Sequence, residues 1–144
     1  MKDDLRRAQC DIRLVESIPE GLIYPNSSIP ENPSTYSVFV ELLEKAESTL
    51  ELASSYWSLR GSDINHEDPT DWQGEDIFKR IHDIASSGNI KVKIAQDLPK
   101  KEMPNKDTEE LSKVNTNNLA IYILKMLYFN SLTSSIFLYM NFDS

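Results

Sequence analysis

The chain has 144 residues and a formal net charge of −8 at pH 7. Its length suits one domain, and its hydrophobic fraction of 40% and charged fraction of 26% are ordinary for a soluble globular protein. Residues 115–144 carry only Lys125 and Asp143, so the charge imbalance falls on residues 1–114. Such an acidic surface opposes loose binding to nucleic-acid phosphates or anionic membranes, although a local basic groove remains compatible with it.

The first part of the chain predicts a strand, a loop and a helix. Apolar residues within 12–18 favour a short strand, which a proline and a glycine would end. Residues 22–33 contain three prolines and several Asn and Ser residues, which is typical of a loop. A hydroxyl of Ser34 or Thr35 can cap a helix that starts there, and apolar residues then recur at helical spacing.

The middle of the chain predicts a buried strand followed by a polar loop. From Thr49 an apolar run leads into Tyr56 and Trp57, and this composition suits a strand. Residues 61–71 are polar, and the last of them, Asp71, can cap a second helix.

The second helix would end at Ser86-Ser87-Gly88. Residues 90–94 alternate apolar side chains with lysines, which predicts a strand with one wet face. Residues 100–106 form a charged loop, and a third helix is expected to begin near Thr108. The order strand, helix, strand, helix, strand, helix indicates an α/β fold with a largely parallel sheet.

Residues 115–144 differ from the rest in composition, because they contain no Gly, Pro, Arg, Trp or Glu and only one Ala. Most of their residue types have A/T-rich codons, so we expect an unrelated apolar tail after Val114, such as intron read-through or an alternative last exon. A membrane span over residues 119–142 is the rival interpretation, since this length can cross the ~30 Å hydrocarbon core. Lys125 and the polar residues 130–135 weigh against it. An ordinary core helix or pair of strands is the third alternative.

Residues that could perform catalysis are few. His66 lies among carboxylates in the polar loop, but the spacing matches no zinc or calcium loop, and a solvated acidic loop is the favoured interpretation. His82 falls on the second helix, where a surface or boundary position is expected. The single cysteine, Cys10, has no histidine nearby, and the sequence has neither a glycine-rich phosphate loop nor a G-x-S-x-G motif. We therefore expect no metal, no cofactor and no complete catalytic site.

Two other features qualify as candidate sites. Tyr56 and Trp57 come at the end of a predicted parallel strand, where ligands bind in open α/β sheets, so they are candidate walls of a substrate pocket. Core packing is the favoured alternative for Trp57. Asn26 begins the triplet Asn26-Ser27-Ser28, an acceptor for N-glycosylation in a luminal protein.

Four stretches together resemble the phospholipase D family, in particular the start of the luminal domain in its D3 and D4 group. They are LVESIPEGL at residues 14–22, with Cys10 just before it, LASSYWSL at 52–59, QGE at 73–75 and IKVKIA at 90–95. Their order and spacing match the group, and the resemblance covers residues 10–114.

The resemblance implies a phosphodiesterase with the phospholipase D fold. Members of this group are single-pass type II membrane glycoproteins of the endoplasmic reticulum and lysosome, and they include 5′-to-3′ exonucleases that act on single-stranded DNA and RNA. Their chemistry uses two H-x-K-x-x-x-x-D motifs and no metal. One histidine attacks phosphorus to form a phosphohistidine, the other protonates the leaving oxygen, and the lysines neutralise phosphoryl charge.

This sequence departs from that catalytic pattern. Two residues after His66 stands Asp68, and two residues after His82 stands Ile84, so neither histidine begins an H-x-K motif. In the family the first motif is expected a few tens of residues beyond the stretch that matches 90–95. No catalytic residue is therefore carried over.

The resemblance also implies that residues 1–9 are a remnant of a stalk and that Cys10 lacks its disulfide partner. We expect a truncated, inactive form of a D3/D4-like phosphodiesterase, whose parent acts on single-stranded nucleic acid or phospholipid in the lumen of the endoplasmic reticulum or lysosome. As written, the N-terminus shows no signal peptide or anchor. The alternatives are a non-catalytic isoform that pairs with the full-length homologue, and a small membrane protein anchored by residues 119–142.

Overall fold

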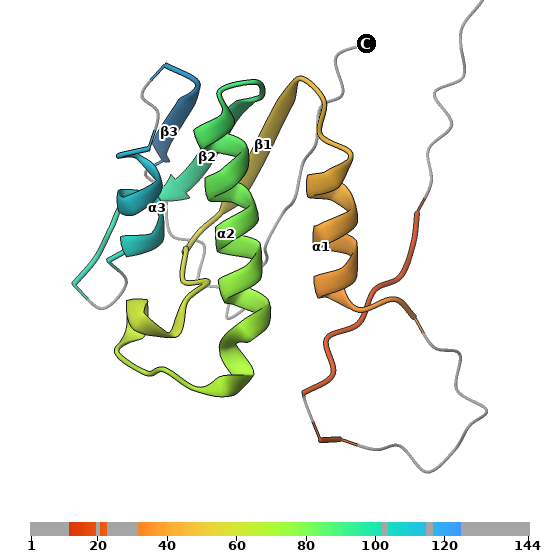
Figure 1. The fold of residues 1–144 in the computed structure, drawn as a ribbon. Coiled ribbons are helices and arrows are strands. Elements are labelled where there is room, and N and C mark those ends of the chain that lie inside the picture. The colour runs from red at the N-terminus through yellow and green to blue at the C-terminus, as the bar shows by residue number, and fades with distance from the viewer. Residues whose placement is uncertain (1–11, 20, 23–31, 102–103, 115–116, 125–144) are drawn as a thin grey trace, which may run out of the picture.

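A computed structural model describes residues 12–19, 21–22, 32–101, 104–114 and 117–124. Within them the chain forms three helices and three strands that alternate along the sequence (Figure 1). The elements, in order, are α1 (Thr35–Glu44), β1 (Thr49–Ser54), α2 (Trp72–Ser87), β2 (Lys91–Asp97), α3 (Lys106–Leu111) and β3 (Leu119–Leu124). Two short 3₁₀ turns, η1 (Gly61–Ile64) and η2 (Pro69–Asp71), lie between β1 and α2.

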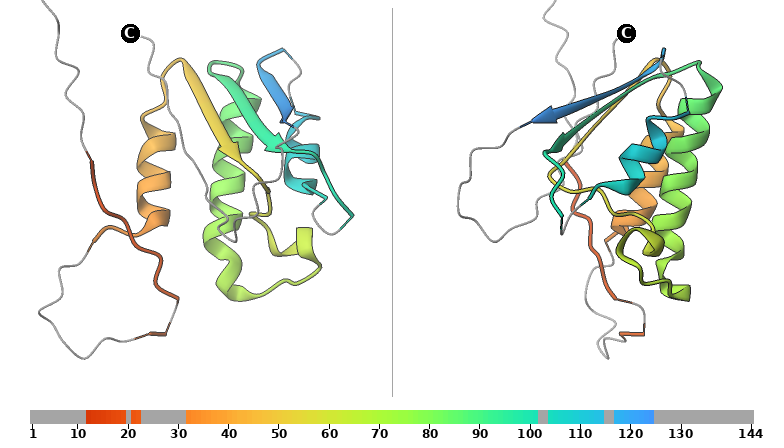
Figure 2. Two further views of the ribbon diagram at one scale, coloured as in Figure 1. Left: turned by 180° about the vertical axis from the view of Figure 1, so that it is seen from behind. Right: turned by 90° about the vertical axis from the view of Figure 1, so that its left-hand side faces the viewer.

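The strands form one parallel sheet in the order β1-β2-β3. The α/β class expected from the sequence, with a parallel sheet, is therefore confirmed. Because each crossover between parallel strands is right-handed and each new strand is added on the same side, the connecting helices fall on one face. Figure 2 shows α1, α2 and α3 together on that face of the sheet.

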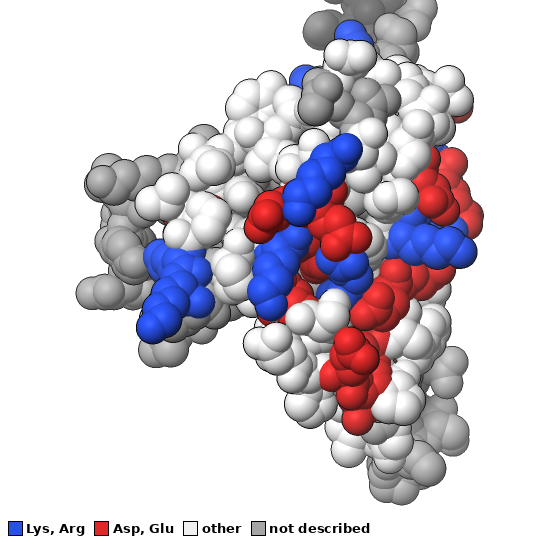
Figure 3. Space-filling model, turned by 60° about the vertical axis from the view of Figure 1, so that its left-hand side comes forward, with Lys and Arg blue, Asp and Glu red and all other residues white. Residues whose placement is uncertain are grey.

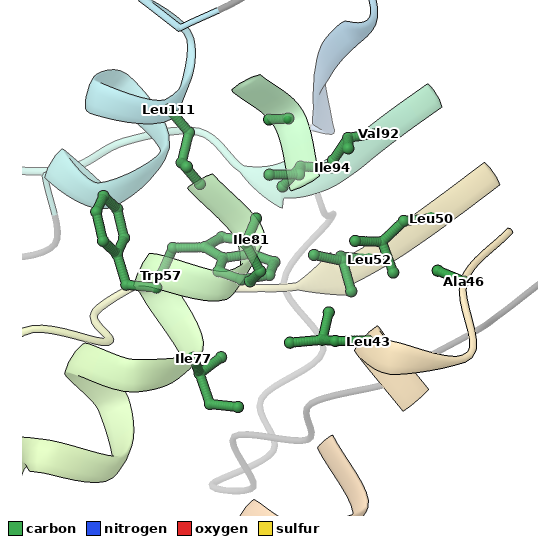
Figure 4. Close-up of a cluster of buried hydrophobic side chains, with 12 residues drawn as sticks. Leu43, Ala46, Leu50, Leu52, Trp57, Ile77, Ile81, Val92, Ile94 and Leu111 are labelled. Carbon is green, nitrogen blue, oxygen red and sulfur yellow. The ribbon is translucent and has the colours of Figure 1, made fainter. Parts of the chain in front are cut away.

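The core lies between the helices and this face of the sheet. Leu50 pairs in register with Val92, and Leu52 with Ile94, so alternate residues of both strands point toward the helices. Side chains from α2 and α3 meet them, as Figure 4 shows for Ile81 and Leu111. Leu50, Ile81, Val92, Ile94 and Leu111 are at most 1% exposed, and their burial is the main stabilising contribution.

Helix α1 starts where the sequence predicted. Ser34 is its N-cap, and its Oγ accepts a hydrogen bond from the amide of Ser37 at 3.0 Å. The stop of α2 is also as expected, because Gly88 adopts a left-handed conformation with φ of 69° just after Ser87.

Asp71 takes the predicted N-cap position of α2, but its side chain makes no capping hydrogen bond to this helix. Asp71 has helical backbone angles, and its Oδ2 accepts from the amide of Asp68 at 2.9 Å. Asp68 in turn accepts from the amide of Thr70, so the two aspartates form a capping box around η2. The 3₁₀ turn therefore uses the carboxylate that was expected to cap α2.

The prediction of a strand at residues 12–18 is wrong. This segment is extended but makes a single bridge, between Glu16 and Ser34, with the amide of Glu16 donating to Pro33 O at 3.1 Å. Its aliphatic side chains stay exposed, 87% for Ile12 and 75% for Leu14, because neither sheet edge lies beside them. The third helix starts two residues earlier than expected, at Lys106.

The third strand comes from the region that composition set apart. Residues 119–124 form β3, which pairs in parallel with β2 from Val92↔Leu119 to Asp97↔Leu124. The first residues of 119–142, the rival membrane-span interpretation, are therefore a strand, and no helix within the described residues is long and apolar enough to cross a bilayer. The rest of that span lies outside the described residues, as do residues 1–9. The division at residue 114 stays a prediction.

Replacing Ile94 by Ala should lower the free energy of unfolding by about 2–5 kcal/mol, because the centre of the sheet cannot close the resulting cavity. Urea denaturation of the full chain measures this loss. Ile64→Ala is the matched control, since this isoleucine in η1 is 56% exposed, and we expect a loss below about 1 kcal/mol. Equal losses in the two variants would contradict this assignment of the core.

Candidate functional site

The carboxyl edge of the sheet gathers the most unusual polar chemistry of the described residues. Ligands bind beyond this edge in open parallel sheets, so its side chains are the natural place to look for function. Gln96, Asn105, Asp107 and Thr108 lie here, at or near the ends of β2 and the start of α3, and none is more than 5% exposed. Buried polar side chains need internal partners, and their partners show what this edge does.

Asn105 and Asp107 hold the segment that leaves β1. Asn105 Oδ1 accepts from the amide of Trp57 at 2.9 Å, and Asp107 Oδ2 accepts from the amide of Leu59 at 2.5 Å. The Asn105 amide nitrogen also donates to Asp97 O at 3.3 Å, which ties the end of β2 to the same point. Two side chains at the start of α3 thus satisfy loop amides about fifty residues earlier in the chain.

Arg60 completes this cluster. Its Nε donates to Asp107 Oδ1 at 2.6 Å and its Nη2 to Glu110 Oε2 at 2.8 Å, while the guanidinium lies 3.7 Å from the centre of the Phe78 ring. Burial opposes the charge of Arg60, but the hydrogen bonds to Glu110 and Asp107 outweigh it and raise the pKa of the guanidinium. The same contact lowers the pKa of Glu110. Arg60 therefore stays charged and joins the loop to both α2 and α3.

A hollow of about 390 Å³ opens beside these residues, between the β2–α3 loop and β3. Its buried floor is polar, since Thr108 Oγ1 donates to Gln96 Oε1 at 2.6 Å, and its β3 wall is apolar, with Ile121 and Ile123. Amides and hydroxyls can hydrogen-bond a polar ligand here, but the described residues that line the hollow include no histidine, cysteine or lysine.

Tyr56 and Trp57 lie just past β1, as the sequence indicated, but they have different environments. Trp57 is 5% exposed and packs in the hydrophobic core, and its Nε1 is buried without a hydrogen-bond partner in the described part of the chain (Figure 4). Core packing, the alternative that the sequence favoured, fits this position. Tyr56 is half-buried, and its carbonyl accepts from Ser54 Oγ. Their role as a pocket wall stays a prediction.

The two histidines are on separate elements. His66 is exposed just after η1, and His82 lies on α2, where its Nδ1 is 3.5 Å from Asp83 Oδ1. Among the described residues no group of three His, Cys, Asp or Glu side chains could hold a metal ion. Cys10 and Asn26 lie outside the described residues.

Sequence reasoning missed Arg60, Asn105 and Asp107. A weak signal for Asn105 existed, because asparagine adopts the left-handed backbone conformation more readily than most residues, and Asn105 has a φ of 54°. The pairing of Arg60 with Asp107 had no local signal, since the two residues are 47 positions apart.

Removing the carboxylate of Asp107 should be costly, because it would leave two loop amides and the partly buried Arg60 without their acceptor. We expect Asp107→Ala to lower the free energy of unfolding by about 3 kcal/mol. The control is Glu109→Ala, which removes an exposed ion pair with Lys113 on the same helix and should change it by less than about 1 kcal/mol. Chemical denaturation of both variants makes the comparison, and similar values would refute the role given to Asp107.

Comparison with known proteins identifies the family. No family model matches the chain. It is 40% identical to the 5'-3' exonuclease PLD3 of Homo sapiens over 102 residues, which are 71% of this chain and 20% of that protein. It is 36% identical to the 5'-3' exonuclease PLD3 of Xenopus laevis over 104 residues, 72% of this chain and 20% of the relative.

A third relative bears a different name. The chain is 34% identical over 90 residues to the Inactive phospholipase D5 of Homo sapiens, which covers 62% of this chain and 16% of that protein. The chain thus spans about a fifth of the length of the curated relatives it matches. The resemblance seen in the four sequence stretches is confirmed, and the chain belongs to the phospholipase D family, with a relationship to the D3 type.

Proposed function

We propose that this chain is the amino-terminal part of a phospholipase D3-like phosphodiesterase and that its 144 residues alone do not turn over phosphodiesters. The observation that carries this proposal is how the buried polar side chains at the carboxyl edge of the sheet are hydrogen-bonded. Its buried polar side chains are engaged in holding the loop after β1, and none of them is a nucleophile or a general acid of the family type.

The phosphohistidine chemistry implied by the family needs two histidines that converge on one phosphorus atom. Here His66 is exposed after η1, whereas His82 lies on α2 against Phe78, with Ser86 Oγ at 3.4 Å from its Nδ1. Neither is followed two residues later by lysine. The residues present therefore lack the attacking and the protonating group of that reaction.

The substrate of the parent enzyme is proposed to be a single strand of nucleic acid, because relatives at 40% identity carry the name 5'-3' exonuclease. Phospholipid is the alternative. On the face drawn in Figure 3, acidic and basic side chains lie next to each other rather than forming a continuous basic stripe. This face gives little non-specific attraction to phosphates, so we do not expect the proposed strand contact on it.

The proposal places the parent in the lumen of the endoplasmic reticulum or lysosome, anchored in the membrane. In that setting Asn26 would carry a glycan and Cys10 would seek a disulfide partner. Metal ions and cofactors have no part in the proposed reaction.

Purified chain should release no product from a chromogenic phosphodiester or from a 5′-labelled single-stranded oligonucleotide. The expected rate is that of buffer alone, because the histidine pair is missing. A His66→Ala, His82→Ala double variant serves as the control. Activity that survives repurification and disappears in the double variant would sink the proposal, whereas equal traces in both preparations indicate a contaminant.

A second candidate function is non-catalytic pairing with a full-length homologue. One observation favours it: within the described residues, all three helices lie on one face of the sheet (Figure 2). The opposite face carries Ala53, Ala95 and Tyr122 side by side, with the Glu51–Lys93 ion pair next to them. Parallel sheets are normally covered on both faces, so this face suits an apolar helix from a partner.

This second function predicts co-purification of the tagged chain with full-length phospholipase D3 from co-expressing cells. Ala95→Glu places a charge at the centre of the open face and should abolish the complex while unfolding temperature changes little. Ser87→Glu, at the end of α2 on the other layer, should leave the complex intact. Failure to recover any complex, or equal recovery of both variants, would count against pairing through this face.

A further inference from the structure

Within the described parts of the chain, the carboxyl group of Asp63 is buried without a hydrogen-bond partner. It lies in η1, between Arg60 and Asn65, and the residue is 3% exposed. Among the described residues nothing donates a hydrogen bond to either of its oxygens. A buried carboxylate without donors is costly, so this side chain is stable in the core only as the neutral acid.

The charged groups around Asp63 do not compensate for ionisation. On α3, Lys106 Nζ donates at 2.7 Å to the main-chain oxygen of Asp63 rather than to its carboxyl group. Arg60, which precedes η1, is engaged by Asp107 and Glu110. Burial, and then the charge of Asp107, raise the pKa of Asp63, against weaker opposing effects of Lys106 and Arg60.

We propose that η1 is a proton-dependent latch: it is closed while the Asp63 carboxyl group is neutral and opens to water when that group ionises. The bonds that would open are local. The amides of Asp63, Asn65 and His66 donate to Arg60 O, Ser62 O and Gly61 O at 3.1, 3.3 and 2.9 Å. The hydrogen bonds of Asp107 to Leu59 and Arg60 lie upstream of the turn, so the loop stays attached to α3 while η1 opens.

The direction of the pH dependence follows from the raised pKa. Below the ordinary aspartate pKa of 3.8, the carboxyl group is neutral in both the closed and the open turn. Its protonation state then favours neither form. As the pH rises from 3.8 to the higher pKa of the closed turn, the open form is ionised while the closed form still holds its proton, so the open form gains population until that higher pKa is passed. The latch is therefore tightest in acid and loosest at alkaline pH.

Hydrogen exchange of the full chain tests this latch. After correction for intrinsic rates, protection of the amides of residues 63, 65 and 66 should fall by about tenfold or more between pH 3, below the ordinary aspartate pKa of 3.8, and pH 8, because an unpaired buried charge costs at least that much. Asp63→Asn, which keeps the shape but cannot ionise, should abolish this fall. Asp83→Asn, at an exposed site on α2, should preserve it.

Two further measurements separate Asp63 from its neighbours. His66 directly follows the turn and its amide belongs to it, so His66→Gln must retain the loss of protection if Asp63 is responsible. In the wild-type chain, the side-chain carboxyl carbon of Asp63 should titrate above the ordinary aspartate range. The latch is refuted if this carbon titrates normally, or if Asp63→Asn leaves the pH dependence of protection unchanged. It does not depend on the proposed function, because it concerns only the turn.

Discussion

The carboxylate of Asp107 connects parts of the chain that are distant in sequence. Its side chain is fully buried and accepts hydrogen bonds from the amides of Leu59 and Arg60 and from the guanidinium of Arg60. Without this acceptor, the segment that leaves β1 would bury two unsatisfied amides. The path of the chain into η1, the position of α3 and the contact of Arg60 with Phe78 all depend on this one group.

This dependence explains why the carboxyl edge looks like a site and yet has little free chemistry. Ligand sites in parallel sheets use loop amides and polar side chains at this edge. Here Asn105 and Asp107 use theirs on the loop itself, and Thr108 bonds Gln96. Polar groups that are hydrogen-bonded within the protein in this way stabilise the loop and the helix that they connect, whereas catalysis needs groups directed at a substrate. The edge is therefore better suited to positioning a neighbouring site than to performing the reaction.

Much of the fold could be predicted from local patterns, and the failures have a common cause. Ser34 and Gly88 marked helix ends correctly, and the alternation in β2 gave its buried face, because caps and periodicity act within a few residues. The segment 12–18 has a strand-like pattern, but a strand forms only beside a partner, and pairing is not local. The link from Arg60 to Asp107 was hidden for the same reason. Of the candidate site, the sequence located Tyr56 and Trp57 but not the residues that fix them.

Relatives named for an activity and a relative named as inactive both match this region. The chain matches proteins named as exonucleases and one named as an inactive phospholipase, at 40% and 34% identity. Similarity of this region to both kinds of protein is therefore no evidence of turnover by the chain itself. The similarity therefore indicates a family relationship of this region, and catalytic activity has to be argued from the histidine motifs.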